Sequence, residues 1–471
     1  MDTPTEQSSR KPQPKLWTPV FILIVGLALG CFVTGQGLNA GTSVYIDRMG
    51  GTATYSGMLA AVFSVAAAIT RFICGPVIDS RGRAFALTIG ALFLVAGTAG
   101  PVVFNDPLAF VVYRFLQGIG FSAVTTAAAT AAADVLPYSR LGEGIGYYGL
   151  GQALAMSIGP ALALLLVATD APDNLYFGLT GISLAVLVLS LFCRYERNPQ
   201  TLPETSVYRM RAEAKDADRE NSAASPDAGA AGAQAQASTA NSDRIANATG
   251  NAPSGGEPAA ANGQTVGGAA TMAEEDPEPT GIRRTFEARA LPGALPMVVL
   301  SPAFGFGIFF IGLYGTSLGI GNAGLFFTVS AVSMIAVRLK SDTYMDRIAP
   351  LKVFAAAVAC GVIAYLLLLA SEANGAFYYA AGFFYGICLG VSMPICQSVA
   401  VKNTPAERWG AANALYLLAT DVGVGIATIV WGAVNDTFGF TTTIWCVIVC
   451  IVLSLVVARL AFPREAREPH R

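Results

Sequence analysis

The sequence predicts an all-α membrane protein in which twelve transmembrane helices form two pseudo-symmetric six-helix bundles. Its composition, a series of apolar runs and an internal repeat each support this fold class. Of the 471 residues, 54% are hydrophobic and 13% are charged, with a mean hydropathy of +0.54. A typical soluble domain has about 25% charged residues. A water-soluble fold of this length could not bury so much apolar surface.

Composition also excludes several classes of function. The formal net charge of -2 argues against a nucleic-acid partner, because phosphate backbones are bound by clustered Lys and Arg side chains. His470 is the only histidine, which argues against a His-based catalytic triad or metal centre. We therefore expect no enzymatic activity, cofactor or metal. The cysteines lie in or beside apolar runs without paired metal-site spacing, at positions 31, 74, 193, 360, 388, 396, 446 and 450.

Twelve apolar runs are long enough to cross a bilayer, whose ~30 Å core needs about 20 residues of helix. The first run exceeds the apolar core of a signal peptide, so we interpret it as the first span. The predicted spans are 16–38, 56–78, 84–104, 107–133, 143–167, 174–192, 292–316, 322–338, 351–370, 376–400, 410–433 and 440–461.

The distribution of Lys and Arg predicts the orientation, because these residues accumulate in cytoplasmic loops. An even number of spans places both termini on one side. The breaks on that side carry Arg10, Lys11, Lys15, Arg81, Arg83, Arg140, Lys340, Arg347, Lys352, Lys402, Arg408, Arg464, Arg467 and Arg471. The opposite breaks carry only Arg48. We therefore predict a multi-pass cell-membrane protein with both termini in the cytoplasm.

A polar segment divides the chain into two halves. Residues 1–192 form the predicted N-terminal bundle, 193–290 a linker and 291–471 the C-terminal bundle. The linker is rich in Ala, Gly, Ser, Pro, Asn and acidic residues, and 221–280 contains neither Leu nor an aromatic residue. Such a segment cannot bury enough apolar surface to offset its chain entropy. We predict a disordered cytoplasmic tether, with a regulatory or partner-binding role as the alternative.

The two halves share an internal repeat. Gly57, Arg71 and Asp79 recur at a constant offset of 267 as Gly324, Arg338 and Asp346. With an offset of 268, Gly118, Pro137, Arg140 and Gly142 recur as Gly386, Pro405, Arg408 and Gly410. Repeated halves around a central site are typical of secondary transporters, which alternate access by rocking one bundle against the other.

The loop after the second span, GPVIDSRGR at 75–83, is the strongest motif. It resembles the loop signature G-x-x-x-D-[RK]-x-G-[RK] of the major facilitator superfamily, although Ser80 replaces a basic residue. This resemblance covers the chain apart from the termini and the linker. It implies a transporter of the major facilitator type, similar to bacterial proton antiporters for drugs and metabolites.

The loop motif implies a set of gating residues. Gly75 would let helices approach closely, Gly82 would permit a tight turn, and Asp79 could bind the N-terminus of a neighbouring helix. In the family that helix is span eleven. The second copy of the motif departs further from the pattern, although Asp346 keeps its place. We predict a gating role, with solvated loop charges as the alternative, for Gly75, Asp79, Arg81, Gly82, Arg83 and Asp346.

Two further motifs resemble family patterns. Arg114 begins the run RFLQGIG, similar to R-x-x-Q-G-x-G in the family's fourth helix, where the arginine is associated with proton transfer and substrate response. A structural arginine is the alternative. Gly159 and Pro160 partly match a Gly-Pro motif of the family's antiporters, and a packing kink at Pro160 is the alternative. The family's cavity-lining helices imply as substrate-cavity candidates Gln36, Asn39, Gln117, Tyr314, Tyr385 and Gln397.

Asp421 is the carboxylate that we place well inside an apolar span. It lies 11 residues after Gly410, about 16 Å from the cytoplasmic end at ~1.5 Å per residue. Arg71, eight residues before Asp79, would lie at a depth of ~12 Å. Because spans two and eleven are neighbours in the family's fold, we predict an ion pair. Asp421 either carries a proton during turnover or forms a fixed ion pair between the halves.

The leading hypothesis is proton-coupled efflux of a small organic compound by alternating access. The first alternative is uptake of a sugar or organic acid by a symporter or facilitator. A non-transporting membrane receptor is an alternative from another class, but the linker offers no signalling domain. The expected partners are a small-molecule substrate, protons and the lipid bilayer, with no nucleic acid, and the protein is expected to function as a monomer.

Overall fold

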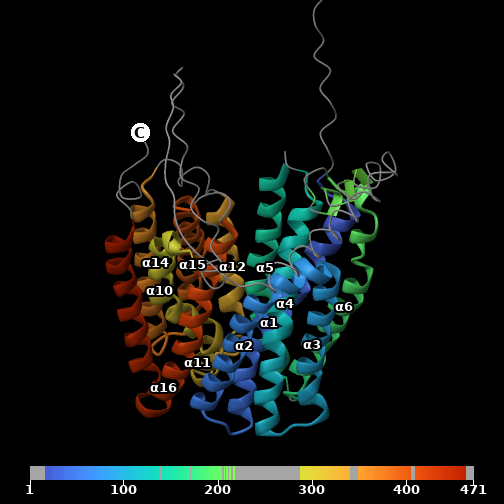
Figure 1. The fold of residues 1–471 in the computed structure, drawn as a ribbon. Helices are drawn as coiled ribbons and strands as arrows, with labels where there is room; N and C mark the ends of the chain where they lie inside the picture. Colours follow the sequence, from blue (N-terminus) through green and yellow to red (C-terminus); the bar gives the residue numbers. More distant parts are fainter. Residues whose placement is uncertain are drawn as a thin grey trace, which may run out of the picture.

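The chain forms an elongated bundle of helices that run between two ends (Figure 1). The described chain begins at Leu16 and finishes at Phe462, and both lie at one end of the bundle. We call this end the linker end. The opposite end, where residues 49–52 turn the chain back, is called the far end. The computed structural model describes residues 16–137, 140–169, 171–203, 206, 208–210, 212–213, 216–217, 287–339, 348–404 and 409–462.

Six helices form the N-terminal half. They are α1 (Pro19–Arg48), α2 (Ala53–Arg81), α3 (Arg83–Val103), α4 (Pro107–Val135), α5 (Leu141–Val167) and α6 (Asn174–Phe192). Side-chain caps define several starts. Thr18 accepts a hydrogen bond from the amide of Phe21, and Asp106 accepts one from the amide of Leu108. A proline follows each cap at the first helical position, where its missing N–H leaves no hydrogen bond unmade.

The C-terminal half begins with the short turn η4 (Ala288–Ala290). Its helices are α10 (Leu291–Phe309), α11 (Ile311–Ser317), α12 (Leu325–Leu339), α14 (Pro350–Ala370), α15 (Ala376–Lys402) and α16 (Trp409–Ala461). α16 contains two helices that meet at Gly439, whose φ of 79° lies in the left-handed region that favours glycine.

The twelve predicted spans are confirmed, with differences in their bounds. Ten described helices are long and apolar enough to cross a membrane, and the shorter α12 and the second helix of α16 complete the twelve. The predicted span 292–316 is interrupted at Phe310, between α10 and α11.

α10 continues through a proline. Pro302 cannot donate a backbone hydrogen bond to the carbonyl of Val298, and the hydroxyl of Ser301 donates to that carbonyl instead.

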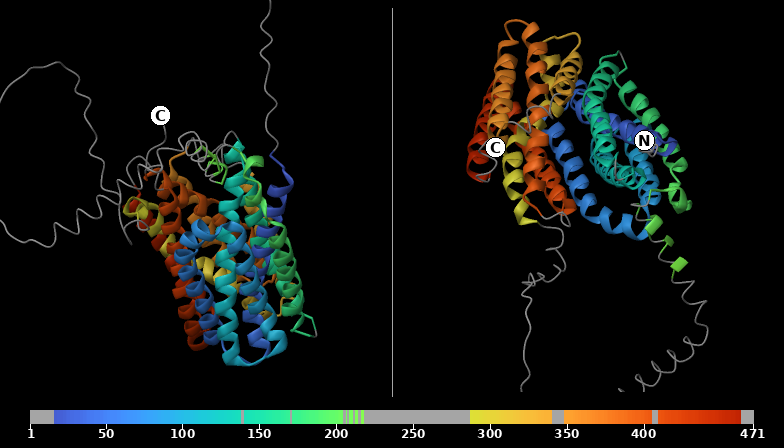
Figure 2. Two further views of the ribbon diagram at one scale, coloured as in Figure 1. Left: turned by 45° about the vertical axis from the view of Figure 1, so that its right-hand side comes forward. Right: turned by 90° about the horizontal axis from the view of Figure 1, so that it is seen from above.

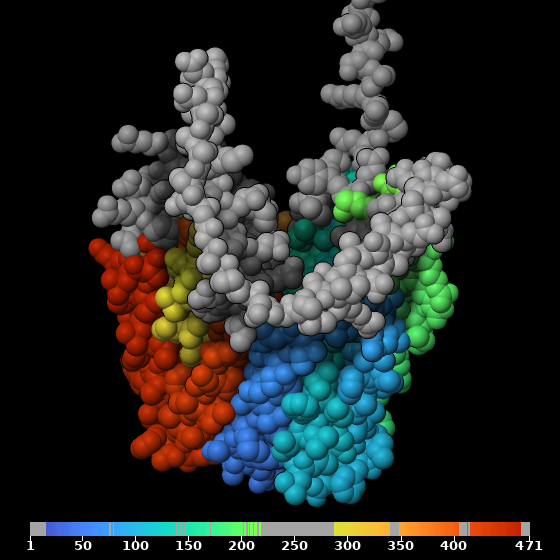
Figure 3. All heavy atoms as spheres, viewed as in Figure 1, coloured from blue at the N-terminus to red at the C-terminus, as the bar shows by residue number. Residues whose placement is uncertain are grey.

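The two halves lie side by side. A view from the linker end separates the blue-to-green N-terminal half from the yellow-to-red C-terminal half (Figure 2). α2 packs along α16 and α12 packs along α5, so each half contributes one helix to each pair. The surface view shows the blue α2 against the orange first part of α16 down to the far end (Figure 3).

The sequence repeat corresponds to equivalent contacts between the halves. A Cβ atom on Gly57 of α2 would clash with the carbonyl oxygen of Thr428 in α16. A Cβ atom on Gly324, beside α12, would lie 3.0 Å from the carbonyl oxygen of Ala161 in α5. Gly57 and Gly324 are related by the offset of 267, and so are Ala161 and Thr428. The halves therefore meet twice through the same close approach of backbones.

The repeat extends to hydrogen bonds within each half. The hydroxyl of Tyr148 donates to the carbonyl of Thr125 at 3.5 Å, and the hydroxyl of Tyr416 donates to the carbonyl of Met393 at 3.0 Å. The two donors are related by the offset of 268, and so are the two acceptors. The helix pairs α4 with α5 and α15 with α16 are thus fastened in the same way.

The segment predicted as a linker begins with residues that pack on the N-terminal half. After α6, two short turns, η2 (Tyr195–Arg197) and η3 (Pro199–Thr201), lie at the linker end. The side chain of Tyr195 is buried. At the other end of the segment, residues 287–290 are described. Residues 218–286, which hold most of the predicted tether, lie outside the described part of the chain.

Replacing Gly57 by Ala is expected to weaken the contact between α2 and α16. The added Cβ atom meets the backbone oxygen of Thr428. A backbone atom inside a helix cannot move aside as the end of a flexible side chain could. Overpacking of this kind costs about 1–3 kcal/mol. The apparent melting temperature of the purified protein should therefore fall.

Gly181→Ala is the matched control, because a Cβ atom there has no atom within 4 Å. A helix gains stability when Gly is replaced by Ala, so this variant should melt at the parental temperature or above. Equal melting temperatures for Gly57→Ala and its parent would contradict the close approach.

Candidate functional site

An ion pair joins the two halves inside the bundle. The Nε atom of Arg71 in α2 lies 2.9 Å from the Oδ2 atom of Asp421 in α16. Arg71 precedes the end of α2 at Arg81, and Asp421 follows the start of α16 at Trp409. At ~1.5 Å per residue both lie about 15–18 Å from the linker end. This confirms the contact that the sequence predicted.

The ion pair is shielded at its centre and open at its edges. The paired Nε and Oδ2 atoms are buried, whereas the two side chains keep 21% and 23% of their surface exposed. A carboxylate at this depth must be paired, hydrated or neutralised. Arg71 supplies the pairing, and neither side chain is completely enclosed by protein. The geometry therefore permits exchange of a proton or of a partner.

Contacts between the halves extend from the far end to this ion pair. Gly57 is followed along α2 by Ser64, whose side chain faces Gly425 of α16, and then by Arg71. In the other helix pair, the hydroxyl of Ser157 in α5 donates to the carbonyl of Phe327 in α12. The two halves are thus closed against each other at the far end.

Arg114 occupies a separate buried site in the N-terminal half. Its side chain is only 1% exposed. Its guanidinium donates to the Oδ1 atom of Asn39 at 2.8 Å, to the Oε1 atom of Gln117 at 3.0 Å and to the carbonyl of Leu59 at 3.3 Å. It also lies 4.7 Å from the ring centroid of Phe63. None of these described partners carries a negative charge.

The Arg114 site binds four helices together. Asn39 belongs to α1, Leu59 to α2 and Arg114 to α4, while the amide of Gln117 donates to the carbonyl of Gly97 in α3. Asn39 and Gln117, which the sequence placed among the cavity candidates, are therefore engaged by Arg114. Their polar atoms are buried in this cluster.

The other cavity candidates occupy different environments. Tyr314 is buried and donates to the carbonyl of Leu368 at 2.9 Å. Tyr385 is buried against Gly307 near the end of α10, and its hydroxyl has no hydrogen-bond partner among the described residues. Gln36 and Gln397 are half-buried. The six residues thus do not share one environment, and their place in a substrate cavity stays a prediction.

The loop after α2 has the predicted turn. Gly82 has a φ of 93° and separates α2 from α3, so a side chain there would be strained. Arg81 is exposed and its guanidinium lies 5.3 Å from the ring centroid of Phe85. The backbone of 75–79 continues α2, but the environment of Gly75 and the side chain of Asp79 lie outside the described parts. Asp346 also lies outside the described residues.

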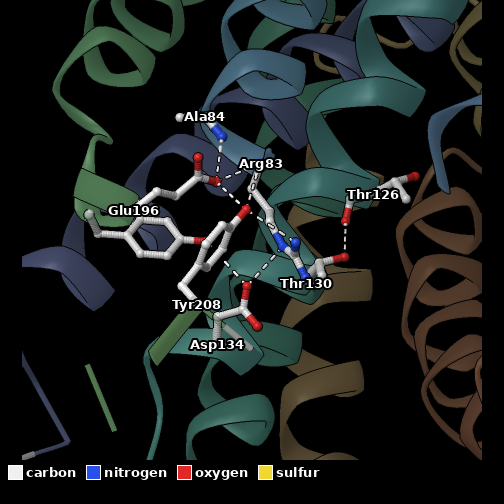
Figure 4. A network of polar contacts seen from close by, with 8 residues as sticks. Arg83, Ala84, Thr126, Thr130, Asp134, Glu196 and Tyr208 are labelled. Atoms are coloured by element: carbon white, nitrogen blue, oxygen red, sulfur yellow. Dashed lines mark hydrogen bonds and ion pairs between the residues drawn. The ribbon is translucent and has the colours of Figure 1, made fainter. Parts of the chain in front are cut away.

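Arg83 forms a polar network that the sequence analysis did not identify (Figure 4). Its Nε atom lies 2.8 Å from the Oδ2 atom of Asp134 at the end of α4. Its Nη1 atom donates to the hydroxyl of Tyr208 at 3.1 Å, and that hydroxyl donates to Glu196 at 2.8 Å. The Tyr195 hydroxyl lies 3.4 Å from Asp134. The network fastens the segment after α6 to the linker end of the N-terminal half.

Glu196 also caps the start of α3. Its Oε1 atom accepts hydrogen bonds from the backbone amides of Arg83 at 2.5 Å and Ala84 at 3.0 Å. These amides begin a helix, where N–H groups lack internal partners and a negative charge is favourable. The clue in the sequence was an acidic residue just after the sixth span, but its partner could not be inferred from spacing.

Gly159 and Pro160 lie inside α5, which continues through them. A Cβ atom on Gly159 would lie 2.6 Å from the carbonyl oxygen of Val33 in α1. The glycine therefore permits close packing of α5 on α1. Within the described ranges, no group of three or more His, Cys, Asp or Glu side chains is placed to hold a metal ion.

Comparison with known families gives one broad match. The family described as the Major Facilitator Superfamily matches residues 21–380 and, in a second alignment, residues 284–471. Together these alignments include all described helices except the start of α1.

Curated relatives match over part of their length. The staphylopine export protein of Staphylococcus aureus is 24% identical over 178 residues, covering 37% of this chain and 44% of the relative. A probable L-galactonate transporter of Escherichia coli is 24% identical over 174 residues, covering 36% of this chain and 38% of the relative. The aligned regions thus span less than half of either relative.

Solved structures match the whole fold. A D-xylose-proton symporter superposes with a TM-score of 0.66 at 13% identity, covering 95% of this chain and 98% of the symporter. The xylose transporter XylE from Escherichia coli, in a partially occluded inward-open conformation, gives 0.64 at 13% identity, covering 95% and 100%. At this identity the similarity concerns the fold alone.

Replacing Glu196 by Gln is expected to loosen the segment after α6. The change removes the charge that caps α3, and loss of a capping interaction costs about 0.5–2 kcal/mol. Cys193 lies three residues away and is only 1% exposed. Its labelling by a maleimide should therefore become faster in the variant.

Glu213→Gln is the control, because Glu213 pairs with Arg209 at the exposed surface. It should leave the labelling of Cys193 unchanged. If Cys193 reacts at the parental rate in Glu196→Gln, then Glu196 does not hold this segment in place.

Proposed function

The chain belongs to the Major Facilitator Superfamily, and we propose that it is a secondary transporter that exports a small organic compound in exchange for protons. The observation that carries this proposal is the ion pair between Arg71 and Asp421. It lies between the halves at membrane depth, where a change of charge acts directly on their separation.

Asp421 is the proposed proton carrier. A proton on its carboxylate removes the attraction to Arg71, and loss of the proton restores it. Intramembrane carboxylates commonly form such relays. Uptake and release of the proton would then favour different arrangements of the two halves.

The remaining predicted residues are assigned roles within this proposal. Arg114 stabilises the N-terminal half and responds to substrate through its contacts with Asn39 and Gln117. Asp79 and Asp346 act as latches at the linker end. We further propose that the linker end faces the cytoplasm of the cell and that the protein works as a monomer.

Proton-coupled uptake is the second candidate. It is supported by the relative named as a probable L-galactonate transporter, whereas export is supported by the relative named as a staphylopine exporter. Growth and accumulation screens in a host that lacks its own efflux pumps should identify a transported compound. Vesicles with an imposed pH gradient then separate the candidates, because an exchanger moves that compound against the direction of proton flow and a symporter moves it with the protons.

Replacing Asp421 by Asn should abolish transport driven by a pH gradient. The amide cannot take up and release a proton, although it can still accept a hydrogen bond from Arg71. Exchange of labelled for unlabelled compound without a gradient should persist, because that process needs no net proton movement. Both fluxes are measured in reconstituted vesicles. Gradient-driven flux at the parental rate would exclude Asp421 as the proton carrier.

The double variant Arg71→Met/Asp421→Leu distinguishes the proton carrier from a fixed ion pair. Replacing both partners by apolar residues avoids leaving one charge unpaired inside the protein. If the pair only joins the halves, this variant should fold and keep gradient-driven transport. If Asp421 carries the proton, it should fold and lack that transport.

A further inference from the structure

A second carboxylate connects the halves at the far end. Asp436 lies near the end of the first helix of α16, three residues before Gly439. Its Oδ1 atom accepts a hydrogen bond from the backbone amide of Ala53 at 3.0 Å, and its Oδ2 atom accepts one from Thr54 at 2.7 Å. Ala53 and Thr54 are the first two residues of α2, in the opposite half.

The contact satisfies groups that a helix leaves without partners. The first amides of a helix have no internal acceptor and carry its positive dipole end. At the start of α2, the side chain of Thr52 accepts from the amide of Tyr55 at 3.1 Å. Asp436 accepts from the two amides before it. A carboxylate bound by two amides forms strong, charge-assisted hydrogen bonds.

The equivalent position in the other helix pair has no carboxylate. At an offset of 268, Asp436 corresponds to Ala168, directly after α5. At an offset of 267, Ala53 and Thr54 correspond to Ile320 and Gly321. These three equivalent residues line a cavity of about 120 Å³ at the far end, together with residues such as Arg48. At the far end, the Asp436 carboxylate therefore joins α16 to α2, whereas the equivalent residues of the other helix pair border a cavity.

The carboxylate is present in the α2–α16 pair and absent at the equivalent position of the α12–α5 pair. If it served packing alone, both pairs would have the same use for it, so the difference indicates a specific function. We propose that Asp436 is a latch that holds the far end closed and that its release from α2 accompanies opening of the far side. The latch holds the two halves together and takes no part in the proton transfer proposed for Asp421. It depends on alternating access but on neither the identity of the substrate nor the coupling ion.

The latch is tested with a reporter cysteine. Ala323 lines the far-end cavity and is only 6% exposed, so Ala323→Cys is introduced into a variant whose eight native cysteines are replaced. Adding Asp436→Asn should then speed labelling by an impermeant maleimide applied from the far side. If the substitution removes one or two of the hydrogen bonds that hold the far end closed, the labelling rate should rise about 5- to 30-fold. Asp173→Asn is the matched control, because Asp173 accepts a hydrogen bond from Tyr45 within one half.

A second variant removes the donor instead of the acceptor. Ala53→Pro lacks one of the amides bound by Asp436, and proline is well suited to the first position of a helix. The residue before it, Thr52, already has the extended backbone that precedes proline. Ala53→Pro should speed labelling on its own, and adding it to Asp436→Asn should have less than its separate effect, because both disrupt one contact.

The outcome separates a latch from general loosening. A single cysteine kept at the buried native position Cys388, which is 3% exposed inside the C-terminal half, should keep its slow labelling in both variants. If Cys388 also becomes reactive, or if Ala323→Cys reacts at the parental rate with Asp436→Asn, the latch proposal is wrong. Because labelling is measured without substrate, a wrong assignment of transport direction or coupling ion leaves this result unaffected.

Discussion

Close contact of backbones between two pairs of helices is the constraint on which this molecule depends. Gly57 brings α2 against α16, and Gly324 brings α12 against α5. Helices in a bilayer gain little from the hydrophobic effect when they associate, so small residues and a few polar contacts must hold them together. The charged contacts at Asp421 and Asp436 both lie on the α2–α16 pair.

Much of this architecture could be predicted because its signals are local or periodic. Apolar runs of membrane length marked the spans, and constant offsets marked the repeat. The pairing of Arg71 with Asp421 followed from depth along two helices and from a family resemblance that made them neighbours. Gly82 was expected at a tight turn, and its φ of 93° agrees with that expectation.

The direction in which individual side chains point could not be predicted. Helices that are apolar on all sides lack the periodic stripe that reveals a buried face. Asn39 and Gln117 were named as cavity candidates from the family resemblance, and their contacts with Arg114 inside one half could not be foreseen. The partners of Glu196 and Asp436 were missed for a different reason. Each carboxylate caps a helix far away in sequence, and capping across such distances leaves no motif.

The Arg114 cluster has a mechanical consequence. A buried guanidinium that holds α1, α2 and α4, with Gln117 extending to α3, resists sliding of any one of these helices. Displacing one would leave a desolvated charge without its acceptors. These four helices of the N-terminal half should therefore move together as one unit. Dyes on any two of these four helices should keep a constant distance while the distance between dyes on opposite halves changes.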